Sequence, residues 1–401
     1  MTAAATTTTT LDLGLYPEIQ RYGTADISAC FSCGTCTASC PLSQTDSTFP
    51  RRMIRYAQLG MKDALLSSKE LWTCYGCGEC AETCPTQADP SQLMAATRRY
   101  AIASYDRTQV ARAMYTRPAV ATVLAVLLAA FFALFMYSAH GPQSGSSLAI
   151  FEFIPEGLIH NTGIVVMILV VLAGLSGIAS MARRIGRREG VGWATVFGSR
   201  AALARAGRAA WFAIAHESLG QARFREDCEA DATDLATVPW FRRRWLVHAL
   251  TVWGFLGLLA ATALDYGLAI LGIKETGTPV PLWYPVRLLG TAAGVALLYG
   301  TTVLIIDRYR MANRSVKRST TADWMLLGLL WVTGLTGFIL ELALYLPEPP
   351  IWGYWVFLVH VAVALELVLL APFMKLAHAV YRPVALFFVA FVAGGKEATD
   401  T

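Results

Sequence analysis

The sequence predicts a mainly α-helical protein in which a small cysteine-rich domain precedes a bundle of six transmembrane helices. Apolar residues make up 55% of the 401 residues and charged residues only 15%. The mean hydropathy of +0.47 is higher than that of an ordinary soluble protein. Eight of the nine cysteines fall within residues 30–84, before the first long apolar run. Their clustering in a cytoplasmic domain predicts metal binding rather than disulfides.

The first residues, 1–11, are predicted to be a disordered lead-in. Their sequence begins MTAAATTTTT and has no charged start followed by an apolar stretch, so no secretory signal is expected. The cysteine-rich domain, 12–115, is therefore expected to stay in the cytoplasm. The net charge of +5 is modest and comes without a basic patch interleaved with aromatic residues. No nucleic-acid partner is expected.

Six apolar runs predict the membrane domain, 116–394. Each is near or above the roughly 20 residues that a helix needs to cross a bilayer. The runs are 118–139, 158–182, 245–271, 284–306, 323–346 and 352–381. A last apolar stretch, 383–394, is too short to cross and is expected to lie in the interface or to pack on the bundle.

The charges of the loops predict the orientation. The segment 183–244 holds twelve Arg, and 307–322 holds five Lys or Arg, whereas 140–157 and 347–351 hold none and 272–283 holds only Lys274. The positive-inside rule places the basic loops in the cytoplasm. Both termini then face the cytoplasm, in a multi-pass protein of the inner membrane. Within the cytoplasmic loop 185–244, the segment 199–216 has Arg on one side and apolar residues on the other, which predicts an interfacial helix.

The cysteines form two copies of one motif, C-x2-C-x2-C-x3-C-P. This is the run used by two-cluster bacterial ferredoxins, in which the fourth cysteine binds the other cluster. The domain is therefore predicted to be a two-cluster α-helical ferredoxin domain with two [4Fe–4S] clusters. Structural zinc usually uses cysteine pairs separated by a longer gap, so zinc is the weaker alternative. The predicted ligands are Cys30, Cys33, Cys36 and Cys84 for cluster 1, and Cys74, Cys77, Cys80 and Cys40 for cluster 2.

The 33-residue insert between the motifs is predicted to be helical. Its Arg51, Arg52, Arg55 and Tyr56 form either a docking face for a soluble partner or a solvated face. The ninth cysteine, Cys228, has no cysteine neighbour and is given no role.

Four of the six histidines lie inside or at the edge of an apolar run: His160, His248, His360 and His378. Ionisable side chains in the membrane are costly and usually functional, although a neutral histidine bonded across helices is the plain alternative. On one continuous helix, the 18 residues from His360 to His378 make five turns, about 27 Å. That arrangement puts one haem ligand near each face of the membrane.

The topology suggests two pairs of axial haem b ligands. His248 and His378 would hold a haem near the cytoplasmic face, and His160 and His360 a second one near the outer face. His140 is also on the outer side, and a protein with one haem remains open, although two are favoured. A clusters-only anchor with structural histidines is the further alternative.

Four other residues are weaker candidates. Glu366 lies between the two haem histidines in sequence and is a candidate proton carrier. Arg287 and Lys375 are candidates for pairing with haem propionates, and snorkelling explains Lys375 equally well. Arg287 is also a candidate for quinone or proton chemistry. His216 lies either near the inner haem or a quinone pocket, or on the surface.

Two parts of the chain resemble known families. The doubled cysteine motif resembles the C subunit of heterodisulfide reductase. The segments HVAVALELVLLAPFMKLAH, from His360 to His378, and LVHALTVWGFLGL, around His248, resemble the haem b gamma subunit of respiratory nitrate reductase. That family has a second histidine where this chain has Leu258. The fusion of both parts resembles the family of C subunits of the quinone-interacting (quinone-modifying) membrane-bound oxidoreductase of sulfur-metabolising bacteria.

The resemblance implies electron transfer between menaquinone and soluble flavin and iron–sulfur subunits, which in turn serve adenylylsulfate reductase. We therefore expect a membrane subunit that links a cytoplasmic flavin or iron–sulfur partner to menaquinone or ubiquinone in the lipid bilayer. One alternative is another donor, such as an electron-transferring flavoprotein, a lactate or glycolate oxidase, or a heterodisulfide reductase. Another is a redox-sensing anchor without turnover.

Overall fold

The computed structural model is mainly helical, and no strand occurs in the part of the chain that it describes. It describes residues 10–44, 48–143, 148–222, 225, 238–274, 280–281, 283–311, 319–346 and 350–397. Cys228 and Lys317 lie outside these ranges, as do the first nine residues of the predicted lead-in.

The N-terminal part is a group of short helices around one core. They are α1 (Leu15–Gln20), α2 (Thr35–Ala38), α3 (Arg51–Gln58), α4 (Lys62–Leu66), α5 (Glu70–Thr73), α6 (Glu79–Glu82) and α7 (Pro90–Tyr105). The longest, α7, begins where the Asp89 side chain accepts a hydrogen bond from the backbone N–H of Gln92, with Pro90 in the first turn. Trp72 and Tyr100 are almost fully buried in the core. The insert between the cysteine motifs is helical, as α3 to α5.

Among the described residues, seven helices are long and apolar enough to cross a membrane. They are α9 (Pro118–Tyr137), α11 (Glu156–Glu189), α16 (Arg244–Ile270), α17 (Pro285–Tyr309), α18 (Thr321–Tyr345), α19 (Trp352–Leu370) and α20 (His378–Glu397). Large apolar side chains such as Val126, Leu127 and Leu172 are exposed on these helices. Such a surface suits lipid, so the chain has the character of a multi-pass membrane protein.

The predicted sixth run, 352–381, is wrong as a single helix. α19 ends at Leu370, two short 3-10 turns follow, and α20 begins at His378. Pro372 has no backbone N–H and so removes a helical hydrogen bond, and the chain leaves the helical path two residues later at Met374, whose backbone is extended (φ −104°, ψ −174°). His360 and His378 therefore lie on different helices, and the five-turn spacing argument does not hold. The stretch 383–394 belongs to α20.

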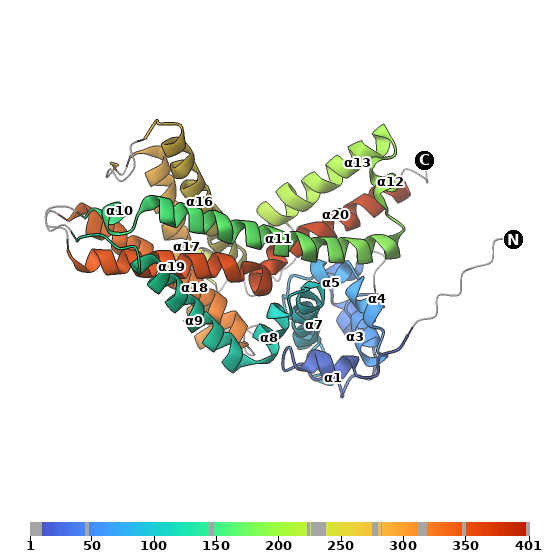
Figure 1. Ribbon diagram of the computed structural model, residues 1–401. Coiled ribbons are helices and arrows are strands. Elements are labelled where there is room, and N and C mark those ends of the chain that lie inside the picture. The colour runs from blue at the N-terminus through green and yellow to red at the C-terminus, as the bar shows by residue number, and fades with distance from the viewer. Residues whose placement is uncertain are drawn as a thin grey trace.

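One helix connects the two parts of the molecule. With 34 residues, α11 is about 51 Å long, which exceeds the roughly 30 Å apolar core of a bilayer. It runs from the end at α10 (Ile150–Phe153) to the N-terminal helices (Figure 1). There Arg184 lies 3.3 Å from the Asp63 carboxylate, and Arg188 donates to the Tyr56 hydroxyl at 2.8 Å.

The last helix also lies against the N-terminal part. α20 packs beside α11, α5 and α13 (Arg200–Trp211) (Figure 1). The ring centroids of Tyr381 on α20 and Trp72 on α5 are 5.2 Å apart. The predicted interfacial helix 199–216 corresponds to α13 and the start of the π-helical segment η2 (Phe212–Leu219). Its alanines Ala202, Ala206 and Ala209 are buried.

Candidate metal centres

The two cysteine motifs fold in the same way. We call residues 30–36 loop 1 and residues 74–80 loop 2. Each loop has two residues with left-handed backbone, Ser32 and Gly34 in loop 1 (φ 63° and 92°) and Gly76 and Gly78 in loop 2 (φ 70° and 96°). A one-turn helix, α2 or α6, follows and carries the third cysteine. Glycine adopts this conformation without the steric cost that Ser32 bears.

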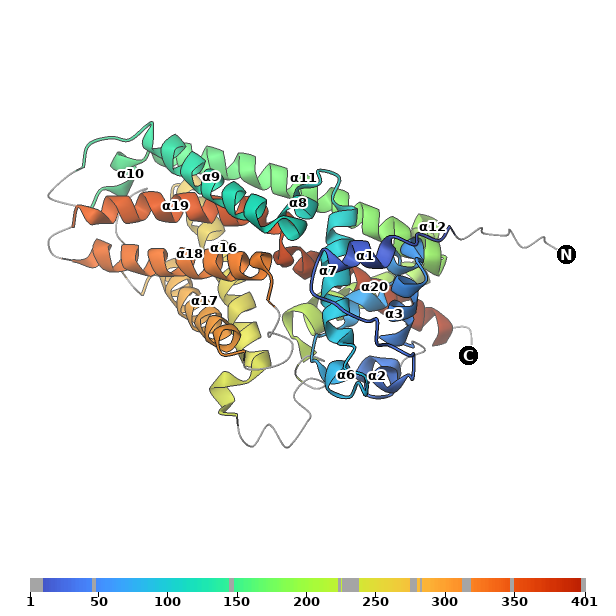
Figure 2. The same cartoon turned by 90° about the horizontal axis from the view of Figure 1, so that it is seen from below.

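The two copies are joined at equivalent positions. Ser39 and Thr83 each precede the fourth cysteine of their motif, and their hydroxyl oxygens are 3.0 Å apart. Helices α2 and α6 lie side by side at one edge of the N-terminal part (Figure 2). Each motif thereby directs its fourth cysteine towards the other motif.

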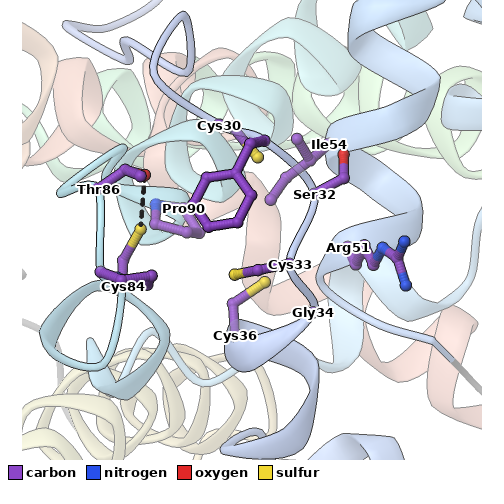
Figure 3. A pocket seen from close by; sticks show the side chains of 12 residues that line it. Cys30, Ser32, Cys33, Gly34, Cys36, Arg51, Ile54, Cys84, Thr86 and Pro90 are labelled. Atoms are coloured by element: carbon purple, nitrogen blue, oxygen red, sulfur yellow. Dashed lines mark hydrogen bonds between the residues drawn. The ribbon is translucent and has the colours of Figure 1, made fainter.

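The cysteine side chains surround two pockets, four to each. Cys84 faces Cys33 and Cys36 across the first pocket, where its sulfur is hydrogen-bonded to Thr86 (Figure 3). The first pocket is lined by Cys30, Cys33, Cys36 and Cys84, and the second by Cys40, Cys74, Cys77 and Cys80. These are the two groups of four that the crossed pairing predicts, and their role as ligands stays a prediction.

This arrangement suits a cluster better than a single ion. In each pocket the four thiols are spread around a space, as a cubane of four irons needs. Burial raises the pKa of the Cys40 thiol to about 12 and also raises that of Cys80. Bound iron would supply the positive charge that holds such thiols as thiolates.

Loop 1 faces solvent. Phe31, which directly follows the first cysteine of the motif, is 65% exposed, and Cys33 is exposed as well. A hydrogen bond from Thr35 lowers the pKa of the Cys33 thiol. Arg55 approaches the loop and donates to the Ser32 hydroxyl at 3.3 Å.

The insert residues serve different purposes. Arg51 lies beside Gly34 of loop 1, and Arg55 contacts the same loop. By contrast, Arg52 pairs with Glu70 at 3.8 Å, and Tyr56 accepts a hydrogen bond from Arg188 of α11. Only Arg51 and Arg55 of the predicted docking face therefore border a cysteine loop.

Loop 2 faces the membrane helices. Arg244, the first residue of α16, donates to the carbonyl oxygens of Gly76 and Cys77, each at 3.4 Å. The Arg382 guanidinium of α20 lies 4.5 Å from the centre of the Tyr75 ring. The Tyr75 hydroxyl donates to Glu217 at 3.4 Å. Sequence reasoning missed Arg244 and Arg382, although the position of Arg244, one helical turn before His248, was an available signal.

Three of the membrane histidines have a fixed tautomer. Nδ1–H of His248 donates to Gln221 Oε1 at 3.0 Å, and that of His378 donates to the Lys375 carbonyl at 2.8 Å. His360 Nδ1 lies 3.0 Å from the hydroxyl of Thr336. This hydroxyl donates its proton to the Val332 carbonyl, so it accepts from the imidazole. In all three rings Nε2 then carries the lone pair that binds a metal.

His248 and His378 share one environment. They lie close enough for their charges to interact, and four basic side chains act on one or both of them, namely Arg98, Arg244, Lys375 and Arg382. His160 and His360 have separate neighbours. The ring centroids of His160 and Tyr266 of α16 are 4.1 Å apart, whereas the His360 ring lies against Gly337 of α18.

The weaker candidates have partners, with one exception. Arg287 pairs with Glu341 at 3.2 Å, and Lys375 pairs with Asp323 at 3.0 Å. The side chain of His216 is 54% exposed and lies 3.4 Å from Glu217. Glu366 is 2% exposed, and its Oε1 has no hydrogen-bond partner among the described residues.

A buried ion network was also missed. Arg99 of α7 and Asp323 of α18 form an ion pair at 2.8 Å, with side chains only 8% and 2% exposed. Arg99 also donates to the carbonyl of Tyr22 at 3.0 Å. The network joins the cysteine-rich part to Lys375, whose carbonyl accepts from His378.

The N-terminal part is similar to known iron–sulfur proteins. Residues 26–88 match the 4Fe-4S dicluster domain family. A segment of 56 residues is 39% identical to the iron-sulfur C subunit of the CoB--CoM heterodisulfide reductase of Methanopyrus kandleri, covering 14% of this chain and 29% of that protein. A segment of 62 residues is 37% identical to the C subunit of the H(2):CoB-CoM heterodisulfide,ferredoxin reductase of Methanothermobacter thermautotrophicus, covering 16% and 34%.

A longer similarity involves Citrate utilization protein B of Escherichia coli. It is 29% identical over 157 residues, which are 39% of each chain. The matching segments thus span less than two fifths of these relatives, and no solved structure matches the chain. The N-terminal part is an iron–sulfur electron-transfer domain with two [4Fe–4S] clusters, related to these proteins and joined to membrane-type helices.

Proposed function

We propose that the protein carries electrons between a soluble flavin or iron–sulfur partner in the cytoplasm and menaquinone or ubiquinone in the membrane. The route runs through the two clusters and haem b. Each internal step moves one electron and breaks no bond. Two electrons and two protons convert a quinone to its quinol, and the soluble partner supplies or accepts the electrons.

The carrying observation is that loop 2 lies against the helices that bear His248 and His378. These two imidazoles have the tautomer that binds iron, and the basic side chains around them would offset the negative propionates. Haem b held there would supply an iron that exchanges one electron. Gln221 and the Lys375 carbonyl would keep the two rings oriented.

A second haem near the outer face is proposed on His360, with His160 as its other ligand. The support for His360 is its tautomer, fixed by Thr336. Among the residues that the structure describes, His160 has no comparable partner, and its Nδ1 lies 3.7 Å from the Glu156 carboxylate. Glu366, buried on the same helix as His360, is the proposed proton carrier for quinone chemistry. Arg287, held by Glu341, is retained as a quinone-side candidate.

For the topology we propose six crossings in the inner membrane, with both termini in the cytoplasm. The basic loops support this orientation. α20 would not cross, because it packs on α5 and α13 beside the iron–sulfur domain. The domains are proposed as 12–115 and 116–394.

The identity of the soluble partner has several candidates. The resemblance to the quinone-interacting oxidoreductase favours flavin and iron–sulfur subunits of sulfur metabolism. Similarity to the C subunit of heterodisulfide reductase and to Citrate utilization protein B favours other donors, the latter over the longer segment. Proteins that co-purify with the chain from its native membranes would separate these candidates.

The function is tested by quinol-driven redox chemistry in proteoliposomes. The oxidised protein receives a menaquinol or ubiquinol analogue, and the reduction of haem b is followed by absorbance. The reverse experiment follows reoxidation of photoreduced clusters by the quinone analogue. Rapid exchange in both directions supports an electron-transfer role, whereas clusters that do not respond to quinone would identify a redox-sensing anchor.

A further inference from the structure

The two clusters have the same backbone framework but different surroundings. Phe31 of loop 1 and Tyr75 of loop 2 occupy equivalent positions, one residue after the first cysteine. Phe31 is 65% exposed, whereas Tyr75 lies beneath Arg382 and donates to Glu217. The two clusters therefore differ in their neighbours and not in their motifs.

We propose that the two clusters have fixed places in the order of electron transfer, which we call the polarity of the protein. Cluster 2, on Cys40, Cys74, Cys77 and Cys80, exchanges electrons with the membrane domain, and cluster 1 exchanges them with the soluble partner. Arg244 is the positioning residue that holds loop 2 at the start of α16. The inference rests on the proposed function and adds the order of the centres and the residue that sets their spacing.

The first argument is the set of contacts on loop 2. Three separate elements of the membrane part reach it: Arg244 from α16, Arg382 from α20 and Glu217 from η2. Contacts from several elements fix a position better than one flexible side chain does. The residues that line both pockets come from the iron–sulfur domain itself, so the clusters differ in the contacts that the membrane part makes with loop 2.

The second argument is the place of Arg244 in the sequence. It lies four residues before His248, so both side chains project from one face of α16. One end of this helical turn contacts the cluster 2 loop and the other carries the proposed haem ligand. A shift of Arg244 would change the distance between the two centres, and its charge acts on both. Outer-shell contacts of this kind tune a metal centre without binding it.

Loop 1 supplies a matched control. Arg55 donates to Ser32, and Arg244 donates to Gly76, which is the equivalent residue of loop 2. Each arginine thus contacts the same position of its own loop from outside. Arg55→Ala removes a hydrogen bond to the Ser32 hydroxyl beside cluster 1, and Arg244→Ala removes the hydrogen bonds to the Gly76 and Cys77 carbonyl oxygens beside cluster 2.

The experiment uses the full chain in detergent, with one cluster removed at a time. Cys33→Ser leaves cluster 2, and Cys77→Ser leaves cluster 1, so each reduced protein gives the EPR spectrum of one cluster. Power saturation is measured with and without a soluble dysprosium chelate, which speeds the relaxation of exposed centres. We expect a strong effect in Cys77→Ser and a weak one in Cys33→Ser. The opposite ranking, or equal effects, would overturn the polarity.

The arginine variants then test the positioning role. Arg244→Ala, made in the Cys33→Ser chain, is expected to shift the EPR spectrum and potential of cluster 2 and to slow electron exchange between this cluster and haem by about tenfold, as loss of an outer-shell contact does. Arg244→Lys keeps the charge and should restore part of the rate. Arg55→Ala, made in the Cys77→Ser chain, should shift cluster 1 alone.

Iron and sulfide content confirms that each variant has folded. An Arg244→Ala protein with full cluster content and unchanged spectrum, potential and rate would refute the positioning role. If the protein held no haem, the proposed function would fail. The chelate measurement would still report which cluster faces the membrane part.

Discussion

Loops 1 and 2 present the same backbone to two different environments. Both have two left-handed residues and a one-turn helix, and both gather three cysteines around a pocket. Loop 1 meets solvent and Arg55, and loop 2 meets Arg244, Arg382 and Glu217. The cysteine motif thus determines which type of cluster forms, whereas residues outside the motif determine the surroundings of that cluster.

The largest effect is expected from the cysteines themselves. Cys33→Ser and Cys77→Ser should each lose one cluster and about half of the bound iron, because ligation and folding of such a loop are coupled. The two variants should differ elsewhere. With cluster 2 lost, the contacts of Tyr75 with Glu217 and Arg382 should loosen, which hydrogen exchange of residues 74–80 and 212–219 would detect. Equal exchange in both variants would contradict the comparison.

The next effect concerns the buried pair that joins the two parts. Asp323→Asn leaves the Arg99 guanidinium buried without its counter-charge, which typically costs about 3–5 kcal/mol. The unfolding temperature in detergent should fall strongly. The control is Asp63→Asn, because Asp63 is 84% exposed and pairs with Arg184 at the surface. Its loss should cost at most about 1 kcal/mol. Similar decreases in the unfolding temperature of both variants would show that the buried pair does not hold the N-terminal part on the membrane helices.

The contact between the two motifs gives a smaller effect. Thr83→Val removes the hydroxyl that meets Ser39 and that also donates to the Glu79 carbonyl at 2.9 Å. We expect a loss of about 1–2 kcal/mol in chemical denaturation of the iron–sulfur domain. Because the contact joins equivalent positions, the EPR spectra of both clusters should change. A change confined to one cluster would argue against coupled motifs.

The smallest effect compares equivalent backbone positions. Gly76 has φ 70° and open space where a Cβ would be, so Gly76→Ala tests backbone strain alone and should cost about 1 kcal/mol. Ser32→Gly relieves similar strain at φ 63° and should stabilise loop 1 by up to about 1 kcal/mol, less the lost contact with Arg55. Denaturant unfolding measures both. If both substitutions changed the free energy of unfolding in the same direction, the two loops would not share the same backbone strain.

The two clusters and the membrane helices could be predicted because they depend on residues that are close together in the sequence. The spacing of Cys30 to Cys40 and of Cys74 to Cys84 predicts two clusters, and the dicluster family match supports them. Long apolar runs likewise predict membrane helices. The break at Pro372 was missed because apolar composition continues across it, and hydropathy does not register a missing N–H.

The contacts between the two parts could not be predicted from spacing. Arg99 and Asp323 are 224 residues apart, and Arg244 is 167 residues from Cys77. Only the folded chain brings them together. The histidines lie between these cases: hydropathy identified His248, His360 and His378, but their partners Gln221, Thr336 and the Lys375 carbonyl come from the fold.

The proposed position of haem b is beside loop 2, on His248 and His378. It is tested by a reduced-minus-oxidised spectrum of the purified protein, with haem counted per chain, for the parent, His248→Ala, His378→Ala and His160→Ala. We expect haem b in the parent and loss of the same haem in the first two variants. Loss of a second haem in His160→Ala would extend the account to the outer pair. A parent without haem, or haem that survives both inner substitutions, would contradict it.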